Sequence, residues 1–116
     1  MLLAPMHAFA QRGDDIDQRP YDDDMVRLAE ILGALHYLSP LCSGDDGPWR
    51  DQMSDLLEAE GPSEVRRARM VEGFNRGFRG FQRTYRSCTD AAAFIVDRYL
   101  DEGNRLADDI ATRHGG

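Results

Sequence analysis

The stretch VEGFNRGFRGFQRTYRSC, residues 71–88, decides the fold class that the sequence predicts. Its large apolar side chains recur every three or four residues and lead to a cysteine: Val71, Phe74, Phe78, Phe81 and Tyr85, then Cys88. On a wheel of 3.6 residues per turn, the five apolar positions fall within about 100° of one another. The spacing therefore predicts a long amphipathic helix from about Ser63 to Ser87, with this aromatic seam facing the core.

Two further stripes run along the same predicted helix. The first consists of small side chains, Gly73, Gly77, Gly80 and Thr84. The second consists of basic side chains, Arg69, Arg76, Arg79, Arg83 and Arg86, which face away from the core. A glycine inside a helix costs about 1 kcal/mol relative to alanine, so close packing against another backbone should offset that cost. This backbone belongs either to another helix of the chain or to another protein molecule.

Three more helices are expected around this one. The first should follow the aspartates at 22–24, which suit a helix N-terminus, and should end at Pro40. The second should begin at Pro48 and stop before Pro62, and the fourth should be capped by Thr89. Helical spacing of apolar residues supports each of them: Met25, Leu28, Leu32 and Leu35 in the first, Trp49, Met53 and Leu57 in the second, and Ala92, Val96, Tyr99 and Ile110 in the fourth.

The two cysteines, Cys42 and Cys88, test this arrangement. Each is expected just after a helix, the first and the third, and these two helices end at the same pole of an up-down bundle. A disulfide is the expected pairing, and closing a loop of roughly 50 residues gives about 4 kcal/mol of stabilisation. The alternatives are a metal pair or two free thiols, but the chain has neither CxxC spacing nor clustered histidines. The predicted fold class is therefore all-α, an up-down four-helix bundle with one disulfide.

The N-terminal segment suggests a cellular compartment. Residues 1–10 end in Ala8-Phe9-Ala10, the small-x-small pattern at which signal peptidase cleaves. We interpret the segment as the remnant of a signal peptide whose positive start is missing; the alternative is a chance pattern in an apolar N-terminus. Export to the periplasm also suits a disulfide. The expected organisation is this remnant at 1–10, a flexible acidic arm at 11–23 and one helical bundle domain at 24–114.

Composition narrows the classes of partner. The chain has 14 basic and 21 acidic residues and a net charge of −7, which argues against nucleic acid as a partner. No stretch reaches the roughly 20 apolar residues that a membrane-spanning helix needs. A chain of 116 residues is expected to form one domain, as a monomer or a homodimer.

Basic charge is concentrated on the third predicted helix. Segment 63–87 has seven arginines and two glutamates, although the chain as a whole is acidic. We call four of these side chains the arginine ridge: Arg76, Arg79, Arg83 and Arg86. One interpretation is a solvated helix face whose charge is offset by neighbouring acids. The other is a binding surface for an anionic partner, either an envelope protein or an anionic polymer.

The residues show no recognisable catalytic, metal-binding or cofactor-binding pattern. His36 lies at the edge of an apolar stripe, and His7 and His114 are in the leader and the tail, so neither a metal nor a cofactor is expected. An interaction module is the main expected function, and Tyr37 and Phe94, which fall outside the apolar stripes, are expected to be exposed contact residues.

Two alternative functions stay open. A small cell-envelope hydrolase or lyase would need a cleft with two convergent carboxylates. A carrier of a hydrophobic ligand would need an enclosed apolar pocket lined by Phe74, Phe78 and Phe81.

Three segments carry a resemblance to known sequences. They are LAEILGALHYL at 28–38 with Leu41-Cys42 after it, WRDQM at 49–53, and FNRGFRGF at 74–81 followed by YRSCT at 85–89. Together they resemble a family of short exported proteins of alphaproteobacteria, over most of 24–110. The function of that family is unknown, so the resemblance implies a periplasmic location and no catalytic residues. The short leader departs from the full signal peptide of the family.

Overall fold

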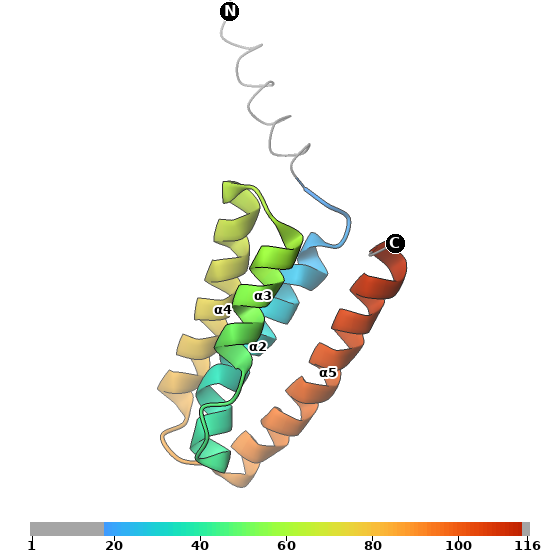
Figure 1. Ribbon diagram of the computed structural model, residues 1–116. Coiled ribbons are helices and arrows are strands. Elements are labelled where there is room, and N and C mark those ends of the chain that lie inside the picture. The colour runs from blue at the N-terminus through green and yellow to red at the C-terminus, as the bar shows by residue number, and fades with distance from the viewer. Residues whose placement is uncertain (1–17, 115–116) are drawn as a thin grey trace, which may run out of the picture.

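The computed structural model describes residues 18–114, which form four helices joined by short loops (Figure 1). The helices are α2 (Asp22–Ser43), α3 (Trp49–Glu60), α4 (Glu64–Thr84) and α5 (Asp90–His114). They alternate in direction, so α2 and α4 run one way while α3 and α5 run the other. This confirms the predicted all-α, up-down four-helix bundle. The expected signal-peptide remnant and residues 11–17 of the expected arm lie outside the described residues.

Helix α2 is the centre of the bundle, and the other three helices pack mainly on it. Nine of its 22 residues are buried, and they cover most of its circumference rather than a single stripe. A helix that is apolar on nearly all sides is stable only when it is surrounded. The core cluster joins Met25 and Leu32 of α2 to Met53 and Leu57 of α3 and to Met70 of α4.

Glycines bring α2 and α4 into direct backbone contact. A Cβ atom added to Gly77 would lie 2.0 Å from the carbonyl oxygen of Glu30, and one added to Gly33 would lie 1.9 Å from that of Phe74. At Gly73, the carbonyl oxygen of Val26 would be 3.0 Å away. For Gly73 and Gly77 of the glycine stripe (Gly73, Gly77, Gly80 and Thr84) the partner is therefore internal, one of the two options that the sequence left open, whereas Gly80 meets no other helix.

The face of α4 that is buried differs from the expected one. Its buried residues are Arg66, Met70, Gly73 and Gly77, so the glycine stripe faces α2. The aromatic seam lies on the flank of this contact, and its members are all half-buried. The centre of the contact shifts toward the small side chains because only they let the two backbones approach so closely.

Two helix ends also differ from the prediction. Pro40 does not end α2, which continues to Ser43 and is closed by the N–H of Gly44 donating to the carbonyl of Pro40. Proline removes only one backbone hydrogen bond, and its φ angle is compatible with a helix, so one more turn can follow it. Helix α4 ends at Thr84 instead of Ser87, and Tyr85 is already extended.

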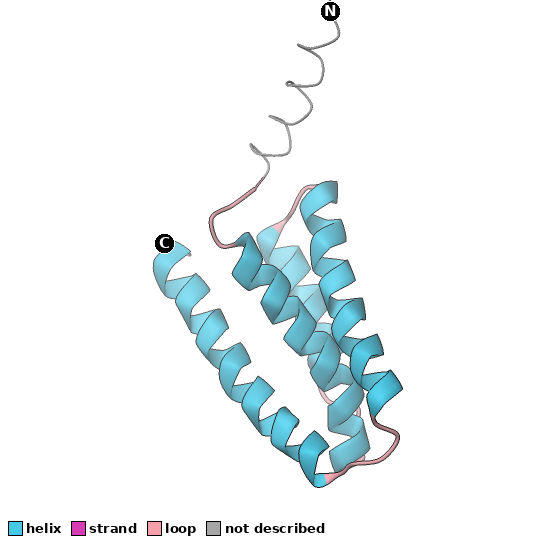
Figure 2. Cartoon of the chain, turned by 180° about the vertical axis from the view of Figure 1, so that it is seen from behind, coloured by secondary structure: helices cyan, strands magenta, loops and turns pink. Residues whose placement is uncertain are grey.

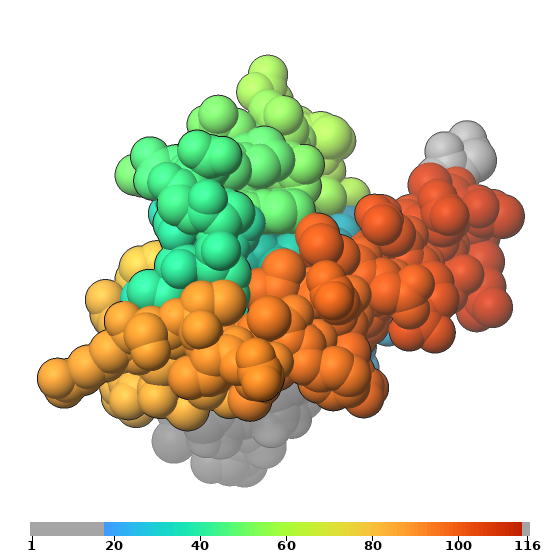
Figure 3. Space-filling model, turned by 90° about the horizontal axis from the view of Figure 1, so that it is seen from below, coloured from blue at the N-terminus to red at the C-terminus, as the bar shows by residue number. Residues whose placement is uncertain are grey.

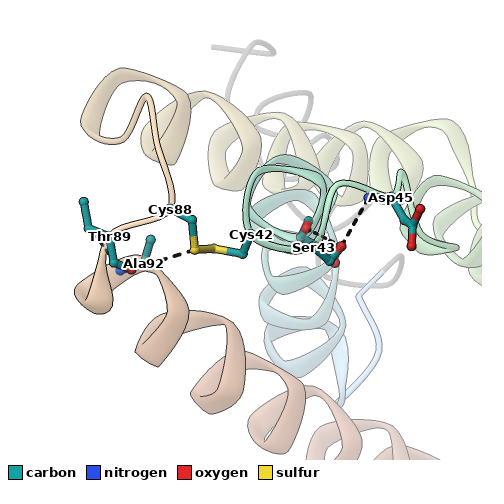
Figure 4. Close-up of a disulfide and its surroundings, with 7 residues drawn as sticks. Cys42, Ser43, Asp45, Cys88, Thr89 and Ala92 are labelled. Atoms are coloured by element: carbon teal, nitrogen blue, oxygen red, sulfur yellow. Dashed lines mark hydrogen bonds between the residues drawn. A yellow bond between two sulfur atoms is a disulfide. The ribbon is translucent and has the colours of Figure 1, made fainter.

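The cysteines form a disulfide, Cys42–Cys88, at the end of the bundle where α2 and α4 both finish (Figure 4). Cys42 lies within the last turn of α2 rather than beyond it, and Cys88 lies in the connection between α4 and α5. Their Cα atoms are 4.8 Å apart. Beside the disulfide, the hydroxyl of Thr89 accepts the N–H of Ala92 and caps α5 as expected.

Helix α5 is the least covered of the four helices. Seen from behind, α5 lies along one side of α2 at the edge of the bundle (Figure 2). Ala92 is the one buried residue among its 25. Its remaining apolar residues are half-buried at best. This weak coverage leaves Phe94 of α5 60% exposed, whereas the apolar core residues of α2 remain buried.

Candidate functional site

The arginine ridge lies on the outer surface of α4, as expected, but its four members have different environments. Arg76 donates to Glu30 at 2.9 Å, so it belongs to the contact between α4 and α2. Arg79 and Arg83 are exposed, and no carboxylate within residues 18–114 pairs with either of them. Arg86 lies beyond the end of α4, in the connection to α5.

A shallow depression of about 350 Å³ opens at the middle of the ridge. It is lined by Glu72, Asn75, Arg76, Arg79, Gly80 and Arg83. A Cβ atom at Gly80 would meet nothing within 4 Å, so this lining glycine packs on no other helix. The guanidinium groups on its rim could therefore donate hydrogen bonds to an anionic group placed over Gly80.

A chain of ion pairs connects this surface to the other side of the bundle. Arg27 of α2 donates to Glu102 of α5 at 2.7 Å and to Glu30 at 2.6 Å, and Glu30 also accepts from Arg76. The guanidinium of Arg27 lies 5.0 Å above the ring of Tyr99 as well. These partly exposed ion pairs join α4 and α5 to α2.

The carboxyl groups of this network have lowered pKa values. The hydrogen bond from Arg27 lowers the pKa of Glu102, and burial opposes it only in part. For Glu30, burial raises the pKa, but hydrogen bonds from Arg76 and Arg27 outweigh it and the net shift is downward. Both side chains therefore stay ionised at neutral pH and stabilise the guanidinium of Arg27.

Arg66 is the site residue that the sequence analysis missed. It is only 4% exposed, and its guanidinium donates to Asp22 at the start of α2 and to Glu60 at the end of α3. The hydroxyl of Tyr21 donates to the same Glu60 at 2.7 Å. Arg66 lies seven residues before Gly73 and so on the glycine stripe, which is the signal that could have placed it against α2.

The two aromatic residues expected on the surface behave differently. Phe94 is 60% exposed at the start of α5, as predicted. Tyr37 is half-buried, because its hydroxyl donates to the carbonyl of Tyr85 and its ring packs edge-on against Phe78. His36 packs against Phe78 too, with ring centroids 5.5 Å apart, and its buried Nδ1 has no hydrogen-bond partner among the described residues.

An open apolar groove lies between α3 and α5, with α2 as its floor. Seen from the disulfide end, α3 and α5 stand apart and the surface of α2 lies in the hollow between them (Figure 3). The groove has a volume of about 330 Å³. Its lining comes from three helices: Leu28, Ile31, Leu32 and Leu35 of α2, Trp49, Gln52, Asp55 and Leu56 of α3, and Tyr99, Leu100, Gly103, Asn104 and Ala107 of α5.

These cavities differ from those that the two alternative functions require. Asp55 is the one carboxylate that lines the groove, so the groove does not bring two carboxylates together. The lining includes none of Phe74, Phe78 and Phe81. The rings of Phe74 and Phe78 pack against His36, and the ring of Phe81 packs against Tyr99. Within residues 18–114, no group of three or more His, Cys, Asp or Glu side chains could hold a metal ion.

Comparison with known proteins identifies a family but no characterised relative. The described helices include none that is long and apolar enough to cross a membrane. No curated protein and no solved structure matches the chain significantly. Residues 20–114 match the model of the family described as "Protein of unknown function (DUF2385)", which includes all four helices and both cysteines, and the chain belongs to this family.

Proposed function

We propose that this protein is an exported interaction module that binds an anionic partner of the cell envelope through the arginine ridge. One observation carries the proposal: Arg79 and Arg83 are neighbouring, exposed and without a carboxylate partner in the described chain, although acids outnumber arginines by 21 to 14. Arg50 and Arg67 are also exposed and form no ion pair within residues 18–114, so what distinguishes Arg79 and Arg83 is their shared place on the depression at Gly80. Glu72 also lines the depression, but three arginines outnumber it there, and the two unpaired ones are available to carboxylate or phosphate groups of another molecule.

The rest of the ridge supports this use of the surface. Arg76 is held in place by Glu30, so one wall of the depression at Gly80 is fixed before a partner arrives. A side chain that is already ordered loses less conformational entropy when it binds. Arg79 and Arg83 supply the free donors, and Arg86 extends the positive surface toward the disulfide end.

Reversing the two free charges tests the proposal. Arg79→Glu combined with Arg83→Glu is expected to abolish capture of partners from a periplasmic extract, because like charges then face the anionic groups. Capture by the wild type should weaken as salt rises, since exposed charges are screened over about 10 Å at 0.1 M salt. The measurement is affinity capture at two salt concentrations, with a thermal melt of each variant to show that it remains folded.

A matched control separates a specific surface from net charge. Arg50→Glu with Arg67→Glu changes the total charge by the same amount, at two exposed positions outside the depression. This control should capture the same partners as the wild type. If the Arg79/Arg83 variant retains every partner, or if the control loses them equally, the ridge is a solvated face and the proposed function is wrong.

Export is part of the proposal and rests on the disulfide, because such bonds persist in oxidising compartments such as the periplasm. We expect the mature protein to begin at Gln11 and to lack the two thiol hydrogens of Cys42 and Cys88. Intact-mass measurement of protein recovered from the periplasm checks both points at once. Two alkylatable thiols, or a chain that retains residues 1–10, would contradict this expectation.

A further inference from the structure

The groove between α3 and α5 has the features of a site for a small ligand. Its volume of about 330 Å³ falls within the range of about 300–1,000 Å³ that is typical of small-molecule sites. Most of the side chains that line it are apolar, and a few polar side chains, Gln52, Asp55 and Asn104, complete the lining. This combination of an apolar body with a few polar groups is the usual composition of such sites.

The floor of the groove is elongated. Leu28, Leu32 and Leu35 of α2 line it at intervals of about one helical turn. Leu28 and Leu32 are 8% and 6% exposed, so most of the accessible apolar surface comes from the half-buried walls: Trp49, Leu56, Tyr99 and Leu100. From Leu28 to Leu35 the helix rises about 10 Å, which is the length of an extended chain of roughly eight methylenes. A slender apolar body that lies parallel to α2 therefore fits the floor better than a compact one.

The charge around the groove is one-sided. Asp55 is the one charged side chain in its lining, and no basic residue lines it. The two helices that form its walls are acidic as a whole, with four acidic residues and one arginine in α3 and six acidic residues and three arginines in α5, but Asp55 is the one acid in the lining. Asp55 makes no ion pair within the described chain, so it is free to accept a cationic group.

We propose that this groove binds a small amphiphile that has a slender apolar body and a cationic head group. The body lies over Leu28 and Leu32, between the half-buried apolar side chains of α3 and α5, and the head group lies at Asp55. The groove shares no residue with the arginine ridge, so this second site is independent of the proposed function. An anionic amphiphile of the same length would place like charge beside Asp55. The groove therefore selects by charge as well as by shape.

The test uses Trp49, which lines the groove and is the only tryptophan in the chain. The full-length protein is titrated with decylammonium below its critical micelle concentration, and the tryptophan emission is followed. A saturable change in emission is expected. Decylammonium should bind about fivefold more tightly than decanol, because the exposed carboxylate of Asp55 attracts the ammonium group and not the neutral hydroxyl. Decanoate should bind more weakly than either. In a series of shorter alkylammonium ions, each added methylene should tighten binding by about fourfold until the floor is filled.

Two pairs of variants locate the ligand. Asp55→Asn should bring the affinities for decylammonium and decanol together, whereas Asp51→Asn, on the same helix but outside the lining, should leave their ratio unchanged. Ala107→Phe should fill the groove and remove binding, whereas Ala91→Phe, exposed elsewhere on α5, should not. Circular dichroism monitors the fold of each variant, and the exposed Asp55→Asn change keeps the test valid even if the phenylalanine variants misfold.

Several outcomes would overturn the inference. One is the absence of a saturable change with any of the three probes. Another is equal affinity for decylammonium and decanoate, or an equal effect of the Asp51 and Asp55 substitutions. A shift of Trp49 emission with protein concentration alone, together with a dimer in sedimentation, would mean that a second copy of the chain covers the groove instead.

Discussion

Replacing Gly77 by alanine is expected to cost more than about 3 kcal/mol of folding free energy, because the new methyl group would lie 2.0 Å from the carbonyl oxygen of Glu30. Both atoms belong to helix backbones, so no flexible side chain can move aside. The helices α2 and α4 must separate along their whole contact, and this contact is the largest in the bundle. Urea denaturation followed by circular dichroism measures the loss.

Gly80 provides the matched control for this prediction. It lies three residues further along α4, and a Cβ atom there would meet nothing within 4 Å. Gly80→Ala should therefore stabilise the protein by up to about 1 kcal/mol, through the better helix propensity of alanine. Opposite signs at Gly77 and Gly80 would establish that the glycine stripe is a packing surface along one part of its length. Equal changes at both positions would contradict the close approach of α2 and α4.

The sequence predicted the fold class because the strongest patterns in it are local. Apolar spacing marked all four helices, and the positions of Cys42 and Cys88 agreed with the up-down order. Pro40 misled the boundary prediction, since one missing N–H does not end a helix that a following glycine can close. The last residue of a helix depends on a few local hydrogen bonds, so the spacing of apolar residues along the sequence predicts it poorly.

The packing of α4 on α2 was harder to predict, because two stripes of α4 competed for the core. Large aromatic rings contribute more apolar area, which favoured the seam. The structure uses the glycines instead, since Ala29, Gly33 and Ala34 give α2 an equally small surface to meet them. The position of the contact is indicated only when the small residues of α2 and of α4 are considered together. A helical-wheel projection of α4 by itself does not show that α2 offers a matching surface of small residues.

The groove could not be predicted, whereas part of the arginine ridge could. The exposed position of Arg79 and Arg83 follows from helix periodicity alone. The groove depends on the separation of α3 and α5 around α2, which results from the side chains of three helices acting together. The distribution of charge gave a partial signal, because acids dominate α3 and α5 while arginines dominate α4.

The second large effect is expected at Arg66, where substitution by methionine should cost about 3 kcal/mol. Methionine keeps much of the apolar stem, but it leaves Asp22 and Glu60 largely buried without their shared cation. Tyr21 would still donate to Glu60, and the N–H of Arg19 would still donate to Asp22, so the loss is that of the guanidinium itself. Thermal and urea denaturation at neutral pH measure it.

The pH dependence of this cluster distinguishes lost charge pairing from lost packing. Burial raises the pKa of Asp22, but hydrogen bonds from Arg66 and from the N–H of Arg19 outweigh it, so the net pKa lies below the ordinary value. A carboxyl group with a lowered folded-state pKa stabilises the fold above its unfolded pKa of about 4, and this contribution disappears as the pH falls through the folded value. The difference in stability between the wild type and Arg66→Met should therefore be largest at neutral pH and should shrink in acid.

Arg105 provides the control, because its side chain is 71% exposed in its ion pair with Asp101. Arg105→Met should change stability by less than about 0.5 kcal/mol at any pH. A deficit at Arg66 that stays constant from neutral to acidic pH would show that packing of the arginine stem, and not its charge, holds the start of α2 to the end of α3.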